Sequence, residues 1–346
     1  MKMPIPTLKW SGNKLKLIDQ TKLPLVFSHI YCSDVSSVWR AIRELKVRGA
    51  PAIGIAAGFG VYLGIRNSSH TSYTSFRKDL DKALSYLSTA RPTAINLFWA
   101  LERMRVLVEE NCNKGIPELK KLILKEAIKI DCEDKLICRC LGAFGEKLIK
   151  DGDNILTYCN AGSLATSDYG TALAAFYRAK EKGKKIKVFA CETRPFLQGA
   201  RLTAWELKKN KIPVTLICDN MAATLMAQGK VDKIFVGSDR TVANGDTANK
   251  VGTYNLAVLA RYHRIPFYVV SPLSSFDFNT KSGKDIPIEE RPVKEMLEFA
   301  GSRIAPYGIR AYYPCFDITP GNLITAIITE KGIFRPPYTK TLKRIE

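Results

Sequence analysis

Two residues of this sequence, Cys159 and Asp239, each place a proton-transferring group just after a predicted β-strand. Cys159 follows the run 154–158 and precedes a glycine-containing loop and a predicted helix, whose N-terminus can lower a thiol pKa. Asp239 follows the apolar run 233–236, and apolar surroundings raise a carboxyl pKa towards the range of a general acid. A thiol and a carboxyl that face one cleft can move protons without a metal or cofactor. The structural alternatives are a small buried side chain for Cys159 and a loop cap for Asp239.

Polar residues also follow the other predicted strands. The segments after the five strands are Cys159-Asn160-Ala161-Gly162, Cys191-Glu192-Thr193-Arg194, Cys218-Asp219-Asn220, Gly237-Ser238-Asp239-Arg240 and Ser271-Pro272. Ligands of an open parallel sheet bind beyond the carboxyl ends of its strands, so these segments predict an active-site rim. Thr193 and Asp219-Asn220 can equally be helix caps, which are common at such positions.

Three segments combine a cation with a predicted helix start, where backbone N–H groups and the helix dipole favour an anion. They are Arg48-Gly49-Ala50-Pro51, Arg91-Pro92-Thr93 and Asn249-Lys250, the last opening the helix after Asp239. Each is weak alone, and together they predict a phosphate site. The chain has no GxxxxGK[ST] loop, and Gly54, Gly58 and Gly60 lack the preceding strand of a dinucleotide site.

Residues 1–130 are predicted to form a mainly helical N-terminal domain that opens with a β-hairpin over residues 8–18. The first helix is capped by Ser33 or Asp34 and closes at Gly49, and the second opens at Pro51. The later helices are predicted over residues 75–88, 93–111 and 117–129. Ala50, Gly54 and Gly58 recur every four residues, which lets another helix approach closely.

Residues 131–346 are predicted to form an α/β domain, because short apolar strands alternate with helical patterns. Such alternation indicates a parallel, doubly wound sheet with right-handed crossovers. The predicted strands are 154–158, 185–190, 213–218, 233–236 and 266–270. The predicted helices are 169–182, 198–210, 220–228, 250–263 and a last helical run over 322–330.

Length and composition limit the remaining possibilities. The 346 residues suffice for about two domains. The longest uncharged apolar run, residues 50–65, is shorter than the roughly 20 residues of a membrane span. The net charge of +20 favours an anionic partner, but without the interleaved aromatic residues of a nucleic-acid platform. Residues 1–8 lack the apolar stretch of a signal peptide, so we expect nine reduced cysteines in the cytoplasm. These features predict a cofactor-free enzyme, without metal, that acts on a small phosphorylated molecule.

Longer motifs then resemble the methylthioribose-1-phosphate isomerase family, in family order from residue 48 to about residue 330. They include Arg48-Gly-Ala-Pro-Ala-Ile-Gly54, Thr157-Tyr-Cys-Asn-Ala-Gly162, Glu192-Thr-Arg-Pro-Phe-Leu-Gln-Gly-Ala-Arg201, Gly237-Ser-Asp-Arg240, Asn244-Gly-Asp-Thr-Ala-Asn-Lys250 and Ile286-Pro-Ile-Glu-Glu-Arg291. The wider superfamily includes ribose-1,5-bisphosphate isomerase and the alpha, beta and delta regulatory subunits of the exchange factor for translation initiation factor two.

The resemblance implies a helical N-terminal domain, a Rossmann-like C-terminal domain and a homodimer. It implies that the chain converts 5-methylthioribose 1-phosphate to 5-methylthioribulose 1-phosphate in methionine salvage. The implied catalytic pair is Cys159 and Asp239. The implied substrate contacts are Arg48, Gly49, Ala50, Arg91, Gln198, Asn249 and Lys250. The alternatives are an isomerase of ribose 1,5-bisphosphate or 5-deoxyribose 1-phosphate, and a non-catalytic translation-factor subunit.

The sequence departs from the family pattern at three places. Tyr158 stands where the family often has His, and Ser238 replaces a usual Ala. The segment Tyr313-Pro-Cys-Phe-Asp317 replaces a usual Asn-Pro-Ala-Phe-Asp. These departures remove no catalytic group, but they bear on how the substrate is positioned.

Overall fold

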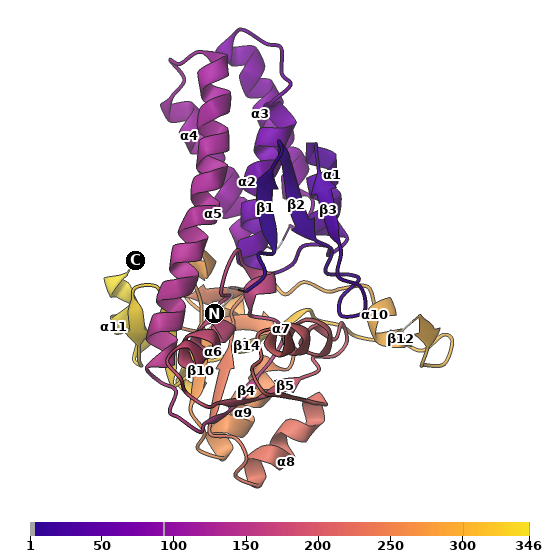
Figure 1. Ribbon diagram of the computed structural model, residues 1–346, viewed down its shortest axis with the longest axis vertical. Helices are drawn as coiled ribbons and strands as arrows, with labels where there is room; N and C mark the ends of the chain where they lie inside the picture. Colours follow the sequence, from indigo (N-terminus) through magenta and orange to yellow (C-terminus); the bar gives the residue numbers. More distant parts are fainter. Residues whose placement is uncertain (1–3, 93, 300, 346) are drawn as a thin grey trace. The chain divides into compact units, whose positions relative to one another are not determined.

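The computed structural model describes residues 4–92, 94–299 and 301–345, and the chain divides into two compact units (Figure 1). The helical unit comprises Lys2–Arg139 and Ser163–Gly170, and the sheet unit comprises Cys140–Gly162 and Thr171–Glu346. Helix α5 (Ile116–Glu146) is much longer than the predicted helix over 117–129, and the predicted domain boundary at residue 130 falls within it.

The helical unit begins with a three-stranded antiparallel sheet of β1 (Leu8–Ser11), β2 (Lys14–Ile18) and β3 (His29–Cys32). The predicted hairpin is therefore confirmed as β1 and β2. Strand β3 was not predicted, because four residues are too few to show an alternating pattern.

Four helices precede α5 in this unit: α1 (Val35–Arg43), α2 (Ala50–Ile65), α3 (Tyr73–Ser88) and α4 (Ile95–Glu110). Asp34 caps α1 by accepting the backbone N–H of Ser37 at 2.7 Å. Helix α1 ends before the predicted Gly49, since Leu45 adopts a left-handed φ of 61° that a helix cannot continue through.

Helix α2 is buried around most of its circumference, and its glycines allow neighbouring helices to approach. A Cβ on Gly54 would lie 2.7 Å from the backbone oxygen of Asn96 in α4. A Cβ on Gly58 would lie 3.1 Å from the Met104 side chain, also in α4. The prediction that small residues every four positions permit close helix packing is confirmed.

The sheet unit contains a seven-stranded sheet in the order β16-β15-β10-β7-β4-β5-β6. Its strands are β4 (Asn154–Thr157), β5 (Lys187–Cys191), β6 (Val214–Ile217), β7 (Lys233–Val236), β10 (Phe267–Val270), β15 (Ala326–Thr329) and β16 (Gly332–Phe334). All neighbours are parallel except β15 and β16. The predicted parallel α/β fold is therefore confirmed.

Helices cover both faces of this sheet, as a doubly wound fold requires. They are α6 (Ala172–Glu181), α7 (Ala204–Lys209), α8 (Ala222–Ala227) and α9 (Thr253–Tyr262). Helix α6 packs on one face through Phe176, whose ring lies 5.7 Å from that of Phe235. Helices α8 and α9 pack on the other face, where Met226 and Leu256 join a core with Ile234.

The prediction of a last helix over residues 322–330 is wrong, since Ala326–Thr329 forms the buried strand β15. Tyr268 of β10 pairs with Ala326 in parallel register. A short apolar run that is buried on both faces lacks the period that separates a strand from a helix.

A smaller sheet in the order β11-β8-β9-β14 follows the carboxyl end of β7. Its strands are β8 (Arg240–Val242), β9 (Thr247–Lys250), β11 (Phe276–Asp277) and β14 (Phe316–Thr319). Further short elements are α10 (Lys294–Leu297), β12 (Glu298–Phe299), β13 (Ser302–Arg303) and α11 (Tyr338–Thr341).

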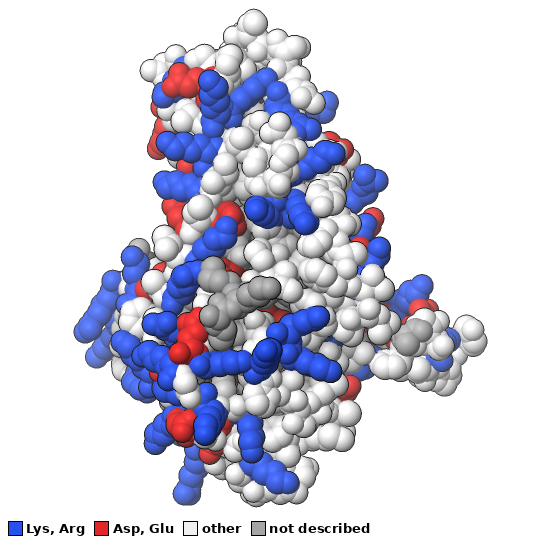
Figure 2. Space-filling model, in the orientation of Figure 1, with Lys and Arg blue, Asp and Glu red and all other residues white. Residues whose placement is uncertain are grey.

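The distribution of charged side chains and the length of the apolar helices bear on the kinds of partner that this fold can bind. On the face shown in Figure 2, Lys and Arg side chains are widely spread, with Asp and Glu among them. Among the described residues, no helix has the combined length and apolar character needed to cross a bilayer.

Candidate active site

The strand order changes direction at β4, and Cys159 and Asp239 lie at this point. From β4 the chain proceeds to β5 and β6 on one side, and then to β7, β10 and β15 on the other. Parallel β4 and β7 are neighbours, with Thr157 paired to Phe235. Cys159 follows β4 and Asp239 follows β7, so both lie at the same edge of the sheet. A change of strand direction opens a crevice beyond the carboxyl ends of the strands, which is where such folds bind ligands.

Cys159 is held in an unusual backbone conformation by three polar contacts. Its φ is 63°, in the left-handed region that non-glycine residues seldom adopt. Its N–H donates to Thr193 Oγ1 at 2.9 Å, and its carbonyl accepts from Thr203 Oγ1 at 2.6 Å. Its Sγ accepts from Gln198 Nε2 at 3.3 Å, which brings two of the predicted site residues together. The Cys159 side chain is half-buried.

Thr193, after β5, and Asp219, after β6, hold the backbone around Cys159 in place. Thr193 also has a left-handed backbone, with φ 65°, and its hydroxyl donates to Cys191 O at 3.1 Å. The carboxylate of Asp219 accepts the N–H groups of Thr193 at 2.8 Å and Arg194 at 2.7 Å. Burial raises the pKa of Asp219, while these two hydrogen bonds oppose the rise.

These contacts decide between the two interpretations of Thr193 and Asp219 that the sequence left open. The side chains do not cap the helices that follow them, because they hold the loop after β5 instead. Their supporting role was not predicted. The partners of Thr193 and Asp219 are 34 and 26 residues away in the chain, beyond any local pattern.

Gln198 is placed by a π-helical turn, Gly199–Thr203, that precedes α7. A Cβ on Gly199 would lie 1.7 Å from Cys191 O, so only glycine fits this position. The Gln198 side chain is fully buried, with its amide nitrogen on the Cys159 sulfur. π-Helical turns occur often at functional sites, and this one sets two of the groups around Cys159, namely Gln198 and Thr203.

Asn249 and Lys250 do not open a helix, so that prediction is wrong. Both lie in β9, where Asn249 pairs with Asp317 and Lys250 pairs with Phe316 of β14. The strand continues to Lys250 because β14 supplies its hydrogen-bond partners, and α9 begins only at Thr253. Asp239 is joined to the same strand, because its N–H donates to Ala248 O at 3.0 Å.

Lys250 is buried, and its ammonium group is held by the segment that departs from the family pattern. Lys250 Nζ donates to Cys315 O at 2.7 Å and to Cys315 Sγ at 2.9 Å. It also lies 4.9 Å from the centre of the Phe316 ring, a cation–π distance. The cysteine that replaces the usual alanine therefore touches a predicted substrate-binding side chain.

Tyr158, which also departs from the family pattern, is a buried hydrogen-bond donor. Its hydroxyl donates to Val251 O at 2.8 Å, and burial raises the pKa of Tyr158 well above its ordinary value. A Cβ on Gly252 would lie 2.2 Å from the Tyr158 hydroxyl, and Gly252 has a φ of 104°. Gly252 is the N-cap of α9, where Asp317 accepts its N–H at 2.6 Å and that of Tyr254 at 3.1 Å.

The other predicted substrate contacts lie in the helical unit. Arg48 precedes Gly49, the N-cap of α2, and Ala50 is the first residue of that helix. Pro51 follows in the first turn, as predicted. Arg91 lies before α4, which begins at Ile95 rather than at the predicted Thr93; Thr93 itself lies outside the described residues.

None of the described His, Cys, Asp and Glu residues form a group of three that could hold a metal ion. The chemistry that the site itself offers is that of its thiol, its carboxylates and its buried lysine.

Comparison with known proteins places the chain in a class that this fold defines. Residues 46–336 match the model of the Initiation factor 2 subunit family, so the chain belongs to that family. It is 52% identical to the methylthioribose-1-phosphate isomerase of Thermotoga maritima over 345 residues, which cover 100% of this chain and 99% of the relative. It is 51% identical to the 5-deoxyribose 1-phosphate isomerase of Moorella thermoacetica over 342 residues, 99% of this chain and 97% of the relative.

The crystal structure of 5-methylthioribose 1-phosphate isomerase from Pyrococcus horikoshii has the same fold. It aligns with a TM-score of 0.92 and 48% identity, and covers 100% of this chain and 96% of that one. The similarity to the isomerase family that the sequence motifs indicated is thus confirmed.

Proposed function

We propose that this chain is a sugar-phosphate aldose–ketose isomerase that converts 5-methylthioribose 1-phosphate to 5-methylthioribulose 1-phosphate in methionine salvage. The observation that carries the proposal is the position of Cys159 and Asp239 after adjacent parallel strands, at the change in strand order. The named relatives support the reaction class, since they are isomerases of two pentose 1-phosphates.

The substrate explains why an acid and a second proton-transferring group are needed. Its anomeric oxygen carries phosphate, so the ring cannot open simply to a free aldehyde. We assign Asp239 as the acid that protonates the ring oxygen while the bond from that oxygen to C1 breaks. Hydrogen then passes from C2 to C1, and the C2 hydroxyl loses its proton to give the ketone.

Cys159 is the second group in this proposal. It either exchanges a proton with the substrate or shields the reacting carbons from water. Hydrogen reaches C1 either as a proton, through an enediolate, or as a hydride. Deuterium at C2 separates these two routes. Full retention of the label at C1 in ordinary water supports a hydride shift, whereas its loss to solvent supports the enediolate.

The remaining predicted residues have binding roles in the proposal. Arg48, Gly49, Ala50 and Arg91 bind the phosphate, because the start of a helix offers backbone N–H groups and a favourable dipole. Gln198, Asn249 and Lys250 bind the rest of the substrate. We also propose a cytoplasmic homodimer, supported by the family resemblance and by nine free cysteines. Light scattering of the purified chain tests the dimer.

The direct test is turnover of 5-methylthioribose 1-phosphate, followed by phosphorus NMR, with 5-deoxyribose 1-phosphate as the alternative substrate. We expect Cys159→Ser and Asp239→Asn each to lower turnover at least ~100-fold, the usual scale for losing an acid or base. Their melting temperatures should stay near that of the parent. A folded parent that turns over neither sugar, or a variant with near-parental turnover, contradicts the corresponding assignment.

A second candidate is a non-catalytic regulatory subunit, as in the translation-factor branch. The family description and the net charge of +20 favour it. A titration with transfer RNA at two salt concentrations separates the two functions, because non-specific binding falls steeply with salt. Tight binding that persists at about 200 mM salt, in protein without isomerase activity, would replace the isomerase proposal.

A further inference from the structure

The loop Ser163–Gly170 is held to the helical unit by buried hydrogen bonds, although its neighbours in sequence belong to the sheet unit. Thr7 Oγ1 donates to Ser163 O at 2.7 Å, and Gln20 Nε2 donates to Leu164 O at 2.7 Å. The third attachment is Ser167, which bonds to α5. Backbone groups of a buried loop need such partners, and here side chains far away in the sequence provide them.

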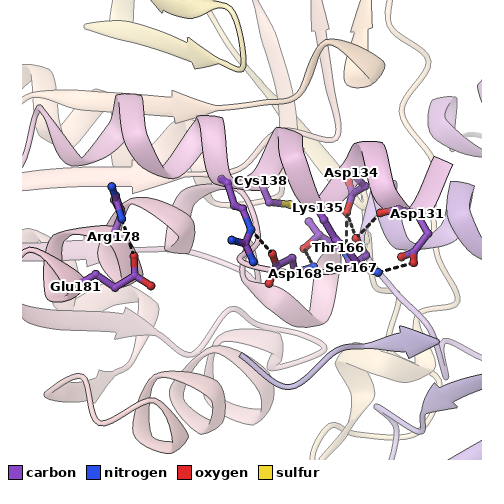
Figure 3. A network of polar contacts seen from close by, with 10 residues as sticks. Asp131, Asp134, Lys135, Cys138, Thr166, Ser167, Asp168, Arg178 and Glu181 are labelled. Atoms are coloured by element: carbon purple, nitrogen blue, oxygen red, sulfur yellow. Dashed lines mark hydrogen bonds and ion pairs between the residues drawn. The ribbon is translucent and has the colours of Figure 1, made fainter. Parts of the chain in front are cut away.

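Asp134 of α5 makes the attachment to Ser167 (Figure 3). A single oxygen, Oδ2, accepts both the Ser167 N–H and the Ser167 hydroxyl, each at 2.8 Å. The same oxygen lies 3.7 Å from Cys138 Sγ, the sulfur donating. Asp134 is only 7% exposed, so without these donors its charge would be costly to bury.

The loop touches Gly49 with no space to spare. A Cβ on Gly49 would lie 2.3 Å from Ala165 Cα and 2.4 Å from Ala165 O. Gly49 is the N-cap of α2 and has a φ of 86°, so its own conformation is already one that favours glycine. Ala165 is two residues from Ser167. A shift of the loop must therefore either move Gly49 or open a gap beside it.

We propose that Asp134 is a positioning residue for the anion-binding start of α2. It anchors Ser167, which keeps Ala165 against Gly49 and so fixes the backbone N–H groups and the arginine that bind the anion. The inference rests on the proposed function in one respect, namely that this anion is the substrate phosphate.

Protonation of Asp134 connects this positioning to pH. Burial, with a smaller contribution from the charge of Asp131, raises the pKa of Asp134 to about 6. The other charged groups around it are Lys135, which pairs with Asp131 at 2.5 Å, and Arg139, which pairs with Asp168 of the loop at 3.0 Å. Burial also raises the pKa of Cys138, so that thiol stays neutral.

Hydrogen bonds to a carboxylate are roughly twice as strong as those between neutral groups. Below pH 6, Asp134 therefore holds Ser167 less firmly, and anion affinity falls. By linkage, binding of the anion near pH 6 favours the ionised form of Asp134 and releases a fraction of a proton per anion bound.

Sulfate is a suitable probe because it stays a dianion from pH 5 to pH 8. We would titrate sulfate into the full chain by calorimetry, at pH 7.5 and pH 6.0, in two buffers of different ionisation heat. Asp134→Asn should weaken sulfate binding about fivefold at pH 7.5. Ser167→Ala should weaken it about threefold, since it removes the hydroxyl contacts with Asp134 and with Asp131 O at 3.2 Å but keeps the N–H bond to Asp134. The control Asp131→Asn keeps both Ser167 bonds and should change affinity less than about twofold. At pH 6.0 the parent should release more protons than Asp134→Asn does.

Unchanged sulfate affinity and unchanged proton release in Asp134→Asn would overturn the proposal. If Asp134→Asn fails to fold, parental affinity in Ser167→Ala overturns it instead. Sulfate binding that survives Arg48→Ala would place the anion elsewhere, and would overturn both this inference and the phosphate site of the proposed function. Arg48-dependent binding that Asp134→Asn weakens, in a chain without turnover, supports this inference and overturns only the isomerase activity.

Discussion

Replacement of Thr193 by valine should loosen Cys159 while leaving the volume of the side chain almost unchanged. The hydroxyl of Thr193 accepts the Cys159 N–H at 2.9 Å and donates to Cys191 O at 3.1 Å. Valine can do neither. A buried N–H left without a partner costs about 1–3 kcal/mol, and the lost donor adds about 1 kcal/mol.

Part of this cost is recovered if Cys159 relaxes. A left-handed non-glycine residue costs roughly 1–2 kcal/mol, which Cys159 regains by returning to an ordinary φ. The net loss in free energy of unfolding is then about 1–2 kcal/mol, the difference between the two effects. The relaxation turns the thiol away from Gln198, which it now meets at 3.3 Å. Turnover should fall at least tenfold, or by more than ~1.4 kcal/mol of transition-state stabilisation.

Urea unfolding, followed by far-UV circular dichroism, measures the first effect, and turnover of the sugar phosphate measures the second. Thr193→Ser is the matched control, because it keeps the hydroxyl and should retain most of both properties. A valine variant as stable and as active as the parent would refute the argument. A loss of stability with normal turnover would show that the thiol does not depend on this hydrogen bond.

Two further predictions concern the start of α9 and the buried lysine beside it. Cys315→Ala removes the sulfur 2.9 Å from Lys250 Nζ but keeps the carbonyl contact, so KM should rise less than about tenfold. Lys250→Met removes the ammonium group itself and should raise KM far more. Steady-state kinetics measures KM for both variants, and an equal rise in KM would mean that the sulfur itself takes part in the reaction. Burial raises the pKa of Asp317 to about 6 from 3.8, so keeping it ionised at pH 7 costs the fold about 3 kcal/mol. The folded state therefore gains from Asp317 as the pH falls from 7 to 4, and any stability advantage of Asp317→Asn over the parent should shrink by up to this amount. Urea unfolding at several pH values checks it, and a pH-independent difference would contradict it.

The sequence predicted the larger elements because their signals are local. Strands β4, β5, β6, β7 and β10 are short apolar runs between turn residues, and each was predicted within two residues of its observed bounds. Strand β15 was mistaken for a helix, because a run buried on both faces has no period of its own. Helix α5 continues past residue 130, since no glycine or proline ends it there.

The candidate site was only partly predictable. Residue type and strand position led to Cys159 and Asp239, and the structure places both after neighbouring strands. Their catalytic role stays a prediction. The placement of Lys250 was not predictable, because this end of β9 is paired with the distant strand β14, and Cys315, which accepts from the Lys250 ammonium group, lies 65 residues later. The hydrogen bonds that hold Cys159 could not be predicted either, since Thr193 and Thr203 lie 34 and 44 residues from it in the chain.

Backbone strain at the site gives an independent reason to regard these side chains as functional. Where this fold needs a positive φ it commonly uses glycine, as at Gly49, Gly152 and Gly252. At Cys159 and Thr193 it keeps a side chain in the left-handed region, at roughly 1–2 kcal/mol each. Backbone conformation alone would favour glycine at both positions. Each side chain instead makes a contact that glycine cannot make: the Cys159 sulfur meets Gln198, and the Thr193 hydroxyl holds Cys159. A positive φ also occurs at other non-glycine residues, such as Leu45 and Arg264, so the backbone angle alone does not mark the site. Strain held by polar contacts of this kind is typical of active sites, and it supports the choice of the Cys159 thiol without reference to any relative.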